Sequence, residues 1–291
     1  MNYRRYLLAA LVLTAPLCPA AAEDLVWFED DKLVLTNGVS TVEGASGGGL
    51  ATWATIAGRE SDRGVGISAH VTGAELPDFR WQSHGAAIGY RNRVELSYAR
   101  QNFDTRAAGE ALGIGRGTII SQDVFGAKLR VLGDTVYGDP LLPQISVGVQ
   151  HKVNRDGPIA LAVGAADTSG TDFTVSATKL VLSHSILVGA TARATKANEG
   201  GLLGYGSAAG EGYSLQFEGT AACQLSRRAV VGAEFRTKPD NLGLGEDDWF
   251  DLFAAYAVTD NLTVTAAYAD LGTIATFEKQ RGGLLSAQLA F

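Results

Sequence analysis

Cysteine and methionine are almost absent from this chain. It contains two cysteines, Cys18 and Cys223, and Met1 is its only methionine among 291 residues. Cys18 lies in an N-terminal segment that export would remove, so Cys223 would be left without an intramolecular partner. No disulfide is therefore expected to stabilise the fold.

Long apolar runs and an excess of positive charge are also missing. After the first 22 residues, no apolar run approaches the roughly 18 residues that a membrane helix needs. The formal net charge is -7, and it becomes -9 when Arg4 and Arg5 are subtracted with the N-terminal segment. Non-specific nucleic-acid binding needs a basic face, so no nucleic-acid partner is expected.

The first 22 residues have the layout of a secretory signal peptide. An arginine pair precedes an apolar core at residues 6–16, and three alanines at 20–22 form a small-residue exit. This order of basic, apolar and small residues is typical of a cleaved export signal rather than a membrane anchor. We therefore expect residues 1–22 to be removed and residues 23–291 to form a single domain.

The rest of the chain is dominated by alternating apolar and polar residues. In "NLTVTAAYAD", for example, Leu262, Val264 and Tyr268 share one face of an extended strand. Thirty-six glycines and seven prolines suit strands joined by turns. Fourteen strand segments are predicted, at about 33–43, 49–58, 64–72, 79–90, 93–103, 117–132, 142–152, 172–182, 185–196, 211–223, 227–238, 248–257, 261–270 and 283–291.

The connections between these segments fall into two classes. From residue 91 onward, tight turns alternate with long loops rich in glycine and charge, if residues 157–167 belong to a loop and 133–141 form a short turn. This asymmetry is typical of outer-membrane barrels, with short periplasmic turns and long extracellular loops. The prediction is an all-β, antiparallel, up-and-down transmembrane β-barrel of about 14 strands, with 12 to 16 possible, in the outer membrane.

The chain ends in "GLLSAQLAF", an alternating segment. Leu285, Ala287, Leu289 and Phe291 share one face, which we expect to contact lipid. A last strand with a terminal phenylalanine resembles the C-terminal signal by which Gram-negative barrels are recognised for assembly. The expected partners are therefore outer-membrane lipid, lipopolysaccharide and the barrel-assembly machinery.

Several longer stretches carry a family resemblance. They are "VEGASGGGLATWATIAG", "VELSYARQNFDT", "SGTDFTVSATK", "KPDNLGLGEDDWFD" and "DLGTIATFEKQRG". Together they resemble a domain-of-unknown-function family of Gram-negative exported proteins, over nearly the whole chain after the signal. The resemblance implies an outer-membrane barrel and no catalytic residue. "LPQISVGVQ" and "GTDFTVSATK" also resemble barrels linked to exopolysaccharide export.

Charged residues gather on the strand faces that the alternation directs into the barrel. Four acids and five bases are nearly balanced there, and such side chains would set the ion preference of a water-filled pore. Alternatively, they pair across the interior and fill it, or loops or the N-terminal segment plug it. The candidates are Glu95, Lys128, Arg130, Lys152, Arg193, Glu218, Glu234, Arg236 and Asp251.

Other chemistry is weakly indicated. The acidic stretch 238–251 matches no calcium-loop spacing, so a solvated loop is the better interpretation, with Trp249 and Phe250 expected in the aromatic girdle. No G-x-S-x-G motif and no Cys/His cluster occurs, so neither a catalytic site, a metal nor a cofactor is expected.

The sequence thus favours a porin-like barrel or small-solute channel of unknown substrate. A non-transporting interaction or assembly barrel, linked to envelope polysaccharide, is the main alternative. An outer-membrane hydrolase and a soluble periplasmic β-protein are further alternatives.

Overall fold

The computed structural model describes residues 26–27, 32–60, 62–207 and 212–291. The predicted signal peptide, residues 1–22, lies outside the described residues. No helix in these ranges is long and apolar enough to cross a membrane.

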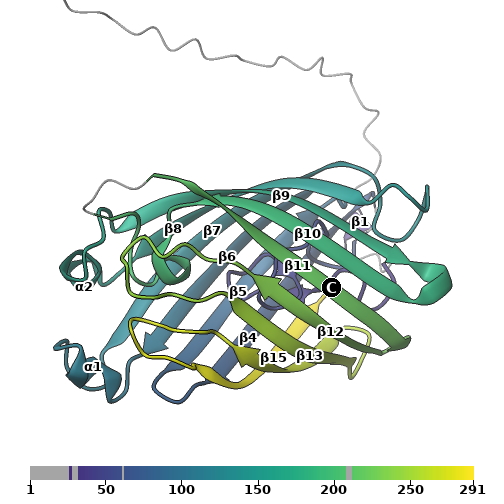
Figure 1. Cartoon of the computed structure of the whole chain (residues 1–291). Coiled ribbons are helices and arrows are strands. Elements are labelled where there is room, and N and C mark those ends of the chain that lie inside the picture. The colour runs from purple at the N-terminus through teal and green to yellow at the C-terminus, as the bar shows by residue number, and fades with distance from the viewer. Residues whose placement is uncertain (1–25, 28–31, 61, 208–211) are drawn as a thin grey trace, which may run out of the picture.

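Twelve antiparallel strands form a closed barrel in the described part of the chain (Figure 1). Each strand pairs with its neighbour in sequence, and the last strand pairs with the first of the twelve, Ala290 opposite Ser68. The strands are β4 (Gly64–Glu75), β5 (Arg80–Tyr90), β6 (Val94–Asp104), β7 (Ile119–Leu132), β8 (Gln144–Asn154), β9 (Ser169–Val181), β10 (Ile186–Thr195), β11 (Ser214–Ser226), β12 (Ala229–Arg236), β13 (Trp249–Ala257), β14 (Leu262–Asp270) and β15 (Arg281–Ala290). The all-β barrel is confirmed, at the lower limit of the predicted strand number.

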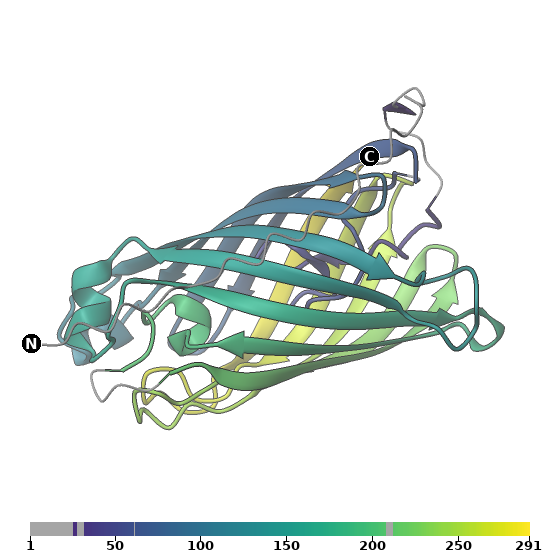
Figure 2. The same cartoon turned by 90° about the horizontal axis from the view of Figure 1, so that it is seen from above.

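The two ends of the barrel differ, as the sequence predicted. At one end, the turn end, the connections are 91–93, 133–143, 182–185, 227–228 and 258–261. At the other, the loop end, long connections carry α1 (Ala108–Ala111), α2 (Gly157–Ala162) and the 3-10 turn η2 (Asn198–Gly201). Figure 2 shows the C-terminus at the turn end, opposite the helices. The turn end corresponds to the periplasmic side of such barrels.

Two predicted strands are wrong. Segments 33–43 and 49–58 contribute only the short pair β2 (Val39–Ser40) and β3 (Ser46–Gly47), and residues 35–60 are all buried. Residues 32–60, here called the inserted segment, run inside the barrel, where the purple trace is seen through the strands in Figure 1. A period-two pattern shows that one face differs from the other, but it does not say whether the segment pairs with the wall.

Glycines allow the inserted segment to approach the wall closely. A Cβ atom added to Gly48 would lie 1.9 Å from Glu234 Oε1, and one added to Gly44, at φ +90°, would lie 3.0 Å from Ala99 Cβ. A side chain at Gly48 would overlap the wall, and one at Gly44 would push the segment away from it. The "GASGGG" stretch therefore fits the narrow interior of the barrel and would be a poor strand in its wall.

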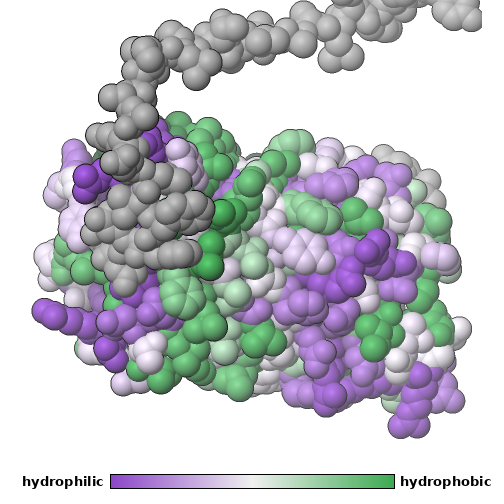
Figure 3. Space-filling model, turned by 180° about the vertical axis from the view of Figure 1, so that it is seen from behind, coloured by the Kyte–Doolittle hydropathy of each residue, from purple (hydrophilic) through white to green (hydrophobic). Residues whose placement is uncertain are grey.

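The outer surface of the wall carries an apolar belt. Along β13, buried and exposed residues alternate strictly, so that Phe250, Leu252 and Tyr256 face outward. Figure 3 shows hydrophilic residues gathered at the loop end, on the right, with hydrophobic residues spread over the wall beside them. An exposed apolar belt on a closed barrel is what a lipid environment requires.

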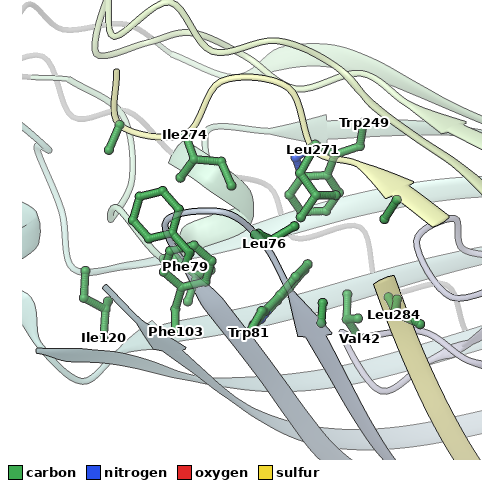
Figure 4. Close-up of a cluster of buried hydrophobic side chains, with 14 of the residues drawn as sticks. Val42, Leu76, Phe79, Trp81, Phe103, Ile120, Trp249, Leu271, Ile274 and Leu284 are labelled. Atoms are coloured by element: carbon green, nitrogen blue, oxygen red, sulfur yellow. The ribbon is translucent and has the colours of Figure 1, made fainter. Parts of the chain in front are cut away.

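An apolar cluster fills the barrel near the loop end (Figure 4). Phe79 and Phe103 lie with ring centroids 4.9 Å apart, and Trp81 and Trp249 with centroids 5.5 Å apart. Trp249 was expected in the outer aromatic girdle, but it is 2% exposed and points inward. The reason is the strand register: Trp249 is the first residue of β13, so Phe250 takes the outward position.

The barrel wall does not use the inserted segment for any of its strand pairings. Deleting residues 32–60 is therefore expected to leave a folded barrel in detergent, with a lower melting temperature because the interior contacts are lost. Gel mobility of unheated against boiled samples and far-UV circular dichroism would measure both. Loss of the heat-modifiable band would contradict this prediction, and the Gly48→Val variant serves as a control that disturbs the same contacts without shortening the chain.

Candidate functional site

Three basic side chains from the wall converge on one carboxylate of the inserted segment. Glu43 Oε1 lies 2.6 Å from Lys152 Nζ and 2.7 Å from Arg236 Nη2, and Glu43 Oε2 lies 3.1 Å from Arg193 Nη2. All four residues are at most 5% exposed. Burial by itself would raise the pKa of Glu43, but the charges of Arg193, Arg236 and Lys152 outweigh it and hold that pKa well below its usual range.

Two wall acids hold these bases in place. Asp172 Oδ2 lies 2.9 Å from Lys152 Nζ and 3.1 Å from an Arg193 nitrogen, while Glu218 Oε1 accepts a 2.6 Å hydrogen bond from Arg193 Nε. The five wall residues come from five consecutive strands, β8 to β12, and alternate in sign around the barrel. Opposite charges on neighbouring strands stabilise one another. With Glu43 they form what we call the Glu43 cluster.

Other wall charges bind the backbone of the inserted segment. Glu234 Oε2 accepts hydrogen bonds from the amides of Leu50 and Ala51, at 2.9 and 3.1 Å. Glu95 accepts from the amide of Ala57 at 2.8 Å, and Lys128 Nζ donates to the carbonyl of Thr55 at 2.9 Å. Buried backbone groups need such partners where regular secondary structure is missing. The wall thus supplies the hydrogen bonds that a strand neighbour would otherwise supply.

Eight of the nine predicted lumen charges are buried inside the barrel. Arg130 differs, because it lies half-buried at the turn end, 3.1 Å from Asp134 and 3.6 Å from Asp62. Asp251 lies opposite Glu234 in the β12–β13 register. Any effect of these side chains on conduction stays a prediction. The eight are Glu95, Lys128, Lys152, Arg193, Glu218, Glu234, Arg236 and Asp251.

Sequence reasoning missed two members of the Glu43 cluster. Asp172 shares its face with Thr174, Ser176 and Thr178, all buried, and this period-two run was a signal that could have found it. Glu43 had no such signal, because its partners are more than 100 residues away in sequence.

The C-terminal strand β15 closes the barrel, and one face of it points outward. Leu285, Leu289 and Phe291 are exposed on the outside, and Ala287 is half-buried there. The carbonyl of Phe291 accepts hydrogen bonds from the amides of Ile67, at 2.9 Å, and Arg59, at 3.1 Å. The end of the chain therefore also contacts the end of the inserted segment. Recognition by the assembly machinery stays a prediction.

A cavity of about 270 Å³ opens where the inserted segment meets the turn end. Its lining includes Lys32, Asn37, Glu60 and Tyr137. Glu60 is fully buried beside Gly66 and Gly89, and its carboxylate lies 3.3 Å from Lys32 Nζ. Burial, partly offset by the Lys32 charge, raises the pKa of Glu60 to about 7.

At the loop end, the apolar cluster of Figure 4 fills the interior. Val42 and Leu50 of the inserted segment belong to this cluster. In the acidic stretch 238–251, Glu246 pairs with Lys238 at 2.7 Å, and Asp240 accepts hydrogen bonds from backbone amides within its own loop. No three His, Cys, Asp or Glu side chains of the described chain gather as a possible metal site.

One serine–histidine pair lies inside the barrel. His70 Nε2 is 3.2 Å from Ser83 Oγ, but Ser83 Oγ donates a 2.7 Å hydrogen bond to the Val42 carbonyl. His70 Nδ1 has no hydrogen-bond partner among the described residues. A hydrolytic triad needs a carboxylate that orients the histidine, and this pair lacks one.

Comparison with known sequences assigns the family. The profile of the family described as protein of unknown function DUF3034 matches residues 36–288. The chain belongs to this family. No curated protein matches it by sequence. The family match includes nearly all of the inserted segment as well as the barrel.

Solved structures show the same fold. The KdgM porin matches with a TM-score of 0.51 at 9% identity, over 77% of this chain and 99% of that one. The KdgM porin in complex with disordered oligogalacturonate gives a TM-score of 0.50 at 9% identity and the same coverage. The NanC porin gives 0.48 at 8% identity, over 77% and 98%. The two KdgM matches show that the barrel has a porin-like fold. Its closed antiparallel wall and outer apolar belt are those of an outer-membrane protein.

The raised pKa of Glu60 predicts that the position of the inserted segment depends on pH; we call the segment seated when it lies inside the barrel as described and released when it has left it. The pKa of Glu60 is about 7 when the segment is seated and near 4.5, the ordinary value, when the segment is released. Between pH 4.5 and pH 7 the seated form therefore binds more protons than the released form. Seating is thus strongest below pH 4.5 and weakens as pH rises to 7. We expect a thiol reagent to label Ser46→Cys faster, relative to the same variant carrying Glu60→Gln, at pH 8 than at pH 5.

Both proteins carry Cys223→Ser, and the intrinsic pH dependence of the thiol cancels in the ratio of the two rates. The Glu60→Gln substitution mimics the protonated carboxylic acid of the seated form. Since a shift of this size changes the equilibrium by roughly tenfold or more, the ratio is large enough to measure. A ratio that stays constant with pH would show that Glu60 has no part in seating.

Proposed function

We propose that this protein is a small-solute channel of the outer membrane whose lumen the inserted segment closes. The observation that carries the proposal is the chemistry of the contact between segment and wall. Glu95, Lys128 and Glu234 hold the segment through hydrogen bonds to its backbone. Water can replace such partners, and the lumen that remains would be polar and charged, as in porins.

The wall beneath the segment is polar along most of its length. Its buried inward-facing residues include Thr72, Gln101, Gln150, Thr191 and Ser286, in addition to the charges. A barrel filled permanently has no need of so many polar groups inside, since apolar packing would be at least as stable. This composition favours an interior that is solvated in another state of the protein.

A disulfide that fixes the segment to the wall would test this channel. The added Cβ of Gly44 would lie 3.0 Å from Ala99 Cβ, so a Gly44→Cys/Ala99→Cys pair can be bridged after the segment moves about 0.8 Å from the wall, since bridged Cβ atoms lie about 3.8 Å apart. In a Cys223→Ser background, we expect no current in planar bilayers when the pair is oxidised, and opening events after reduction. Each single cysteine variant, treated with the same oxidant, is the control.

The variant lacking residues 32–60 gives the upper limit of the conductance. If it forms a heat-modifiable barrel that passes no current, the solute channel is refuted. That result would favour the second candidate, a non-transporting barrel that acts as an envelope interaction or assembly scaffold, because the wall and loop residues of the apolar cluster would then be sufficient to close the loop end.

A further inference from the structure

The Glu43 cluster is neutral only while Glu43 is part of it. Lys152, Arg193 and Arg236 contribute three positive charges, and Asp172 and Glu218 with Glu43 contribute three negative ones. Withdrawal of the inserted segment leaves a charge of +1 inside the barrel, near the loop-end termini of β8 to β12. A buried positive charge without a partner is costly, so this site demands an anion or water in place of Glu43.

The three bases have partners other than Glu43 that hold their orientation. Arg193 donates through Nε to Glu218 and through Nη1 to Gln150 Oε1, each at 2.6 Å. The Arg236 guanidinium lies 5.0 Å from the centroid of the Trp249 ring, and Asp172 holds Lys152. None of these contacts involves the inserted segment. The site is therefore preorganised, which lowers the cost of binding a ligand.

We propose that Lys152, Arg193 and Arg236 form a binding site for the carboxylate of a transported solute, and that Glu43 occupies this site in the closed channel. The inference rests on the proposed function, because the site is open only when the inserted segment has moved. A solute carboxylate competes with Glu43 for the same three donors. Because such a solute binds the open state more tightly than the closed state, it shifts the population toward the open state.

The matched pair glucuronate and glucose tests the site, since the two sugars differ in the carboxylate. In the variant lacking residues 32–60, we expect glucuronate to bind by calorimetry and to interrupt the current at concentrations where glucose does neither. Arg193→Gln should weaken this binding roughly tenfold or more, because a charge-assisted hydrogen bond is lost. Lys179→Gln, which removes a base bound to the carbonyl of Asp139 outside the cluster, is the control and should bind as before.

A second variant, Glu43→Gln, keeps the test independent of any folding defect in Arg193→Gln; it is compared with the unmodified full chain. In the full chain, glucuronate should raise the open probability and glucose should not. Glu43→Gln should open without either sugar, and its open probability should no longer respond to glucuronate.

The outcomes separate the two proposals. Current with equal effects of glucuronate and glucose overturns the carboxylate site and leaves the channel standing. Glucuronate binding without any current refutes the channel and supports the site. Neither binding nor current overturns both.

Discussion

The need to neutralise charge inside the barrel governs the rest of this structure. Nine charged side chains of the wall, the eight predicted ones and Asp172, are buried inside the barrel, and each unpaired buried charge costs several kcal/mol. The wall cannot satisfy them alone, since Glu234 and Asp251, both acids, lie opposite each other in register. The inserted segment supplies amide donors, carbonyl acceptors and one carboxylate. Water admitted along the lumen, together with an anion at the position of Glu43, could take its place.

The two ends of the closed barrel are sealed by different interactions. Apolar packing seals the loop end, and hydrogen bonds hold the segment at the middle and the turn end. The seals are linked, because Val42 and Leu50 belong to the apolar cluster while Glu43 and Leu50 bind wall charges. Withdrawal of the segment toward the turn end would take two members from the cluster. A single movement can therefore weaken both seals.

The wall was predictable from sequence, and its contents were not. In β13 every second residue faces lipid, so a local pattern is sufficient to place Phe250 and Leu252. The same pattern in segments 33–43 and 49–58 was misleading, because alternation does not distinguish a lipid-facing strand from a folded insert. The contacts of Glu43 with Lys152 and Arg236 span 109 and 193 residues of sequence. No local rule reports such a pairing, although the alternating threonines and serines of β9 did mark the face that carries Asp172.

Most contacts of the inserted segment use its backbone, and only some use a side chain. This difference indicates which part of the segment determines the specificity for a solute. Leu50, Ala51, Thr52 and Ala57 are held through backbone amides, and Gly48 is needed for its lack of a side chain. Backbone groups are the same at every position, so these contacts fix the path of the segment without selecting a ligand. Glu43 is different, because its side chain contacts all three bases inside the barrel. The chemistry that a solute must match is therefore concentrated in a single carboxylate.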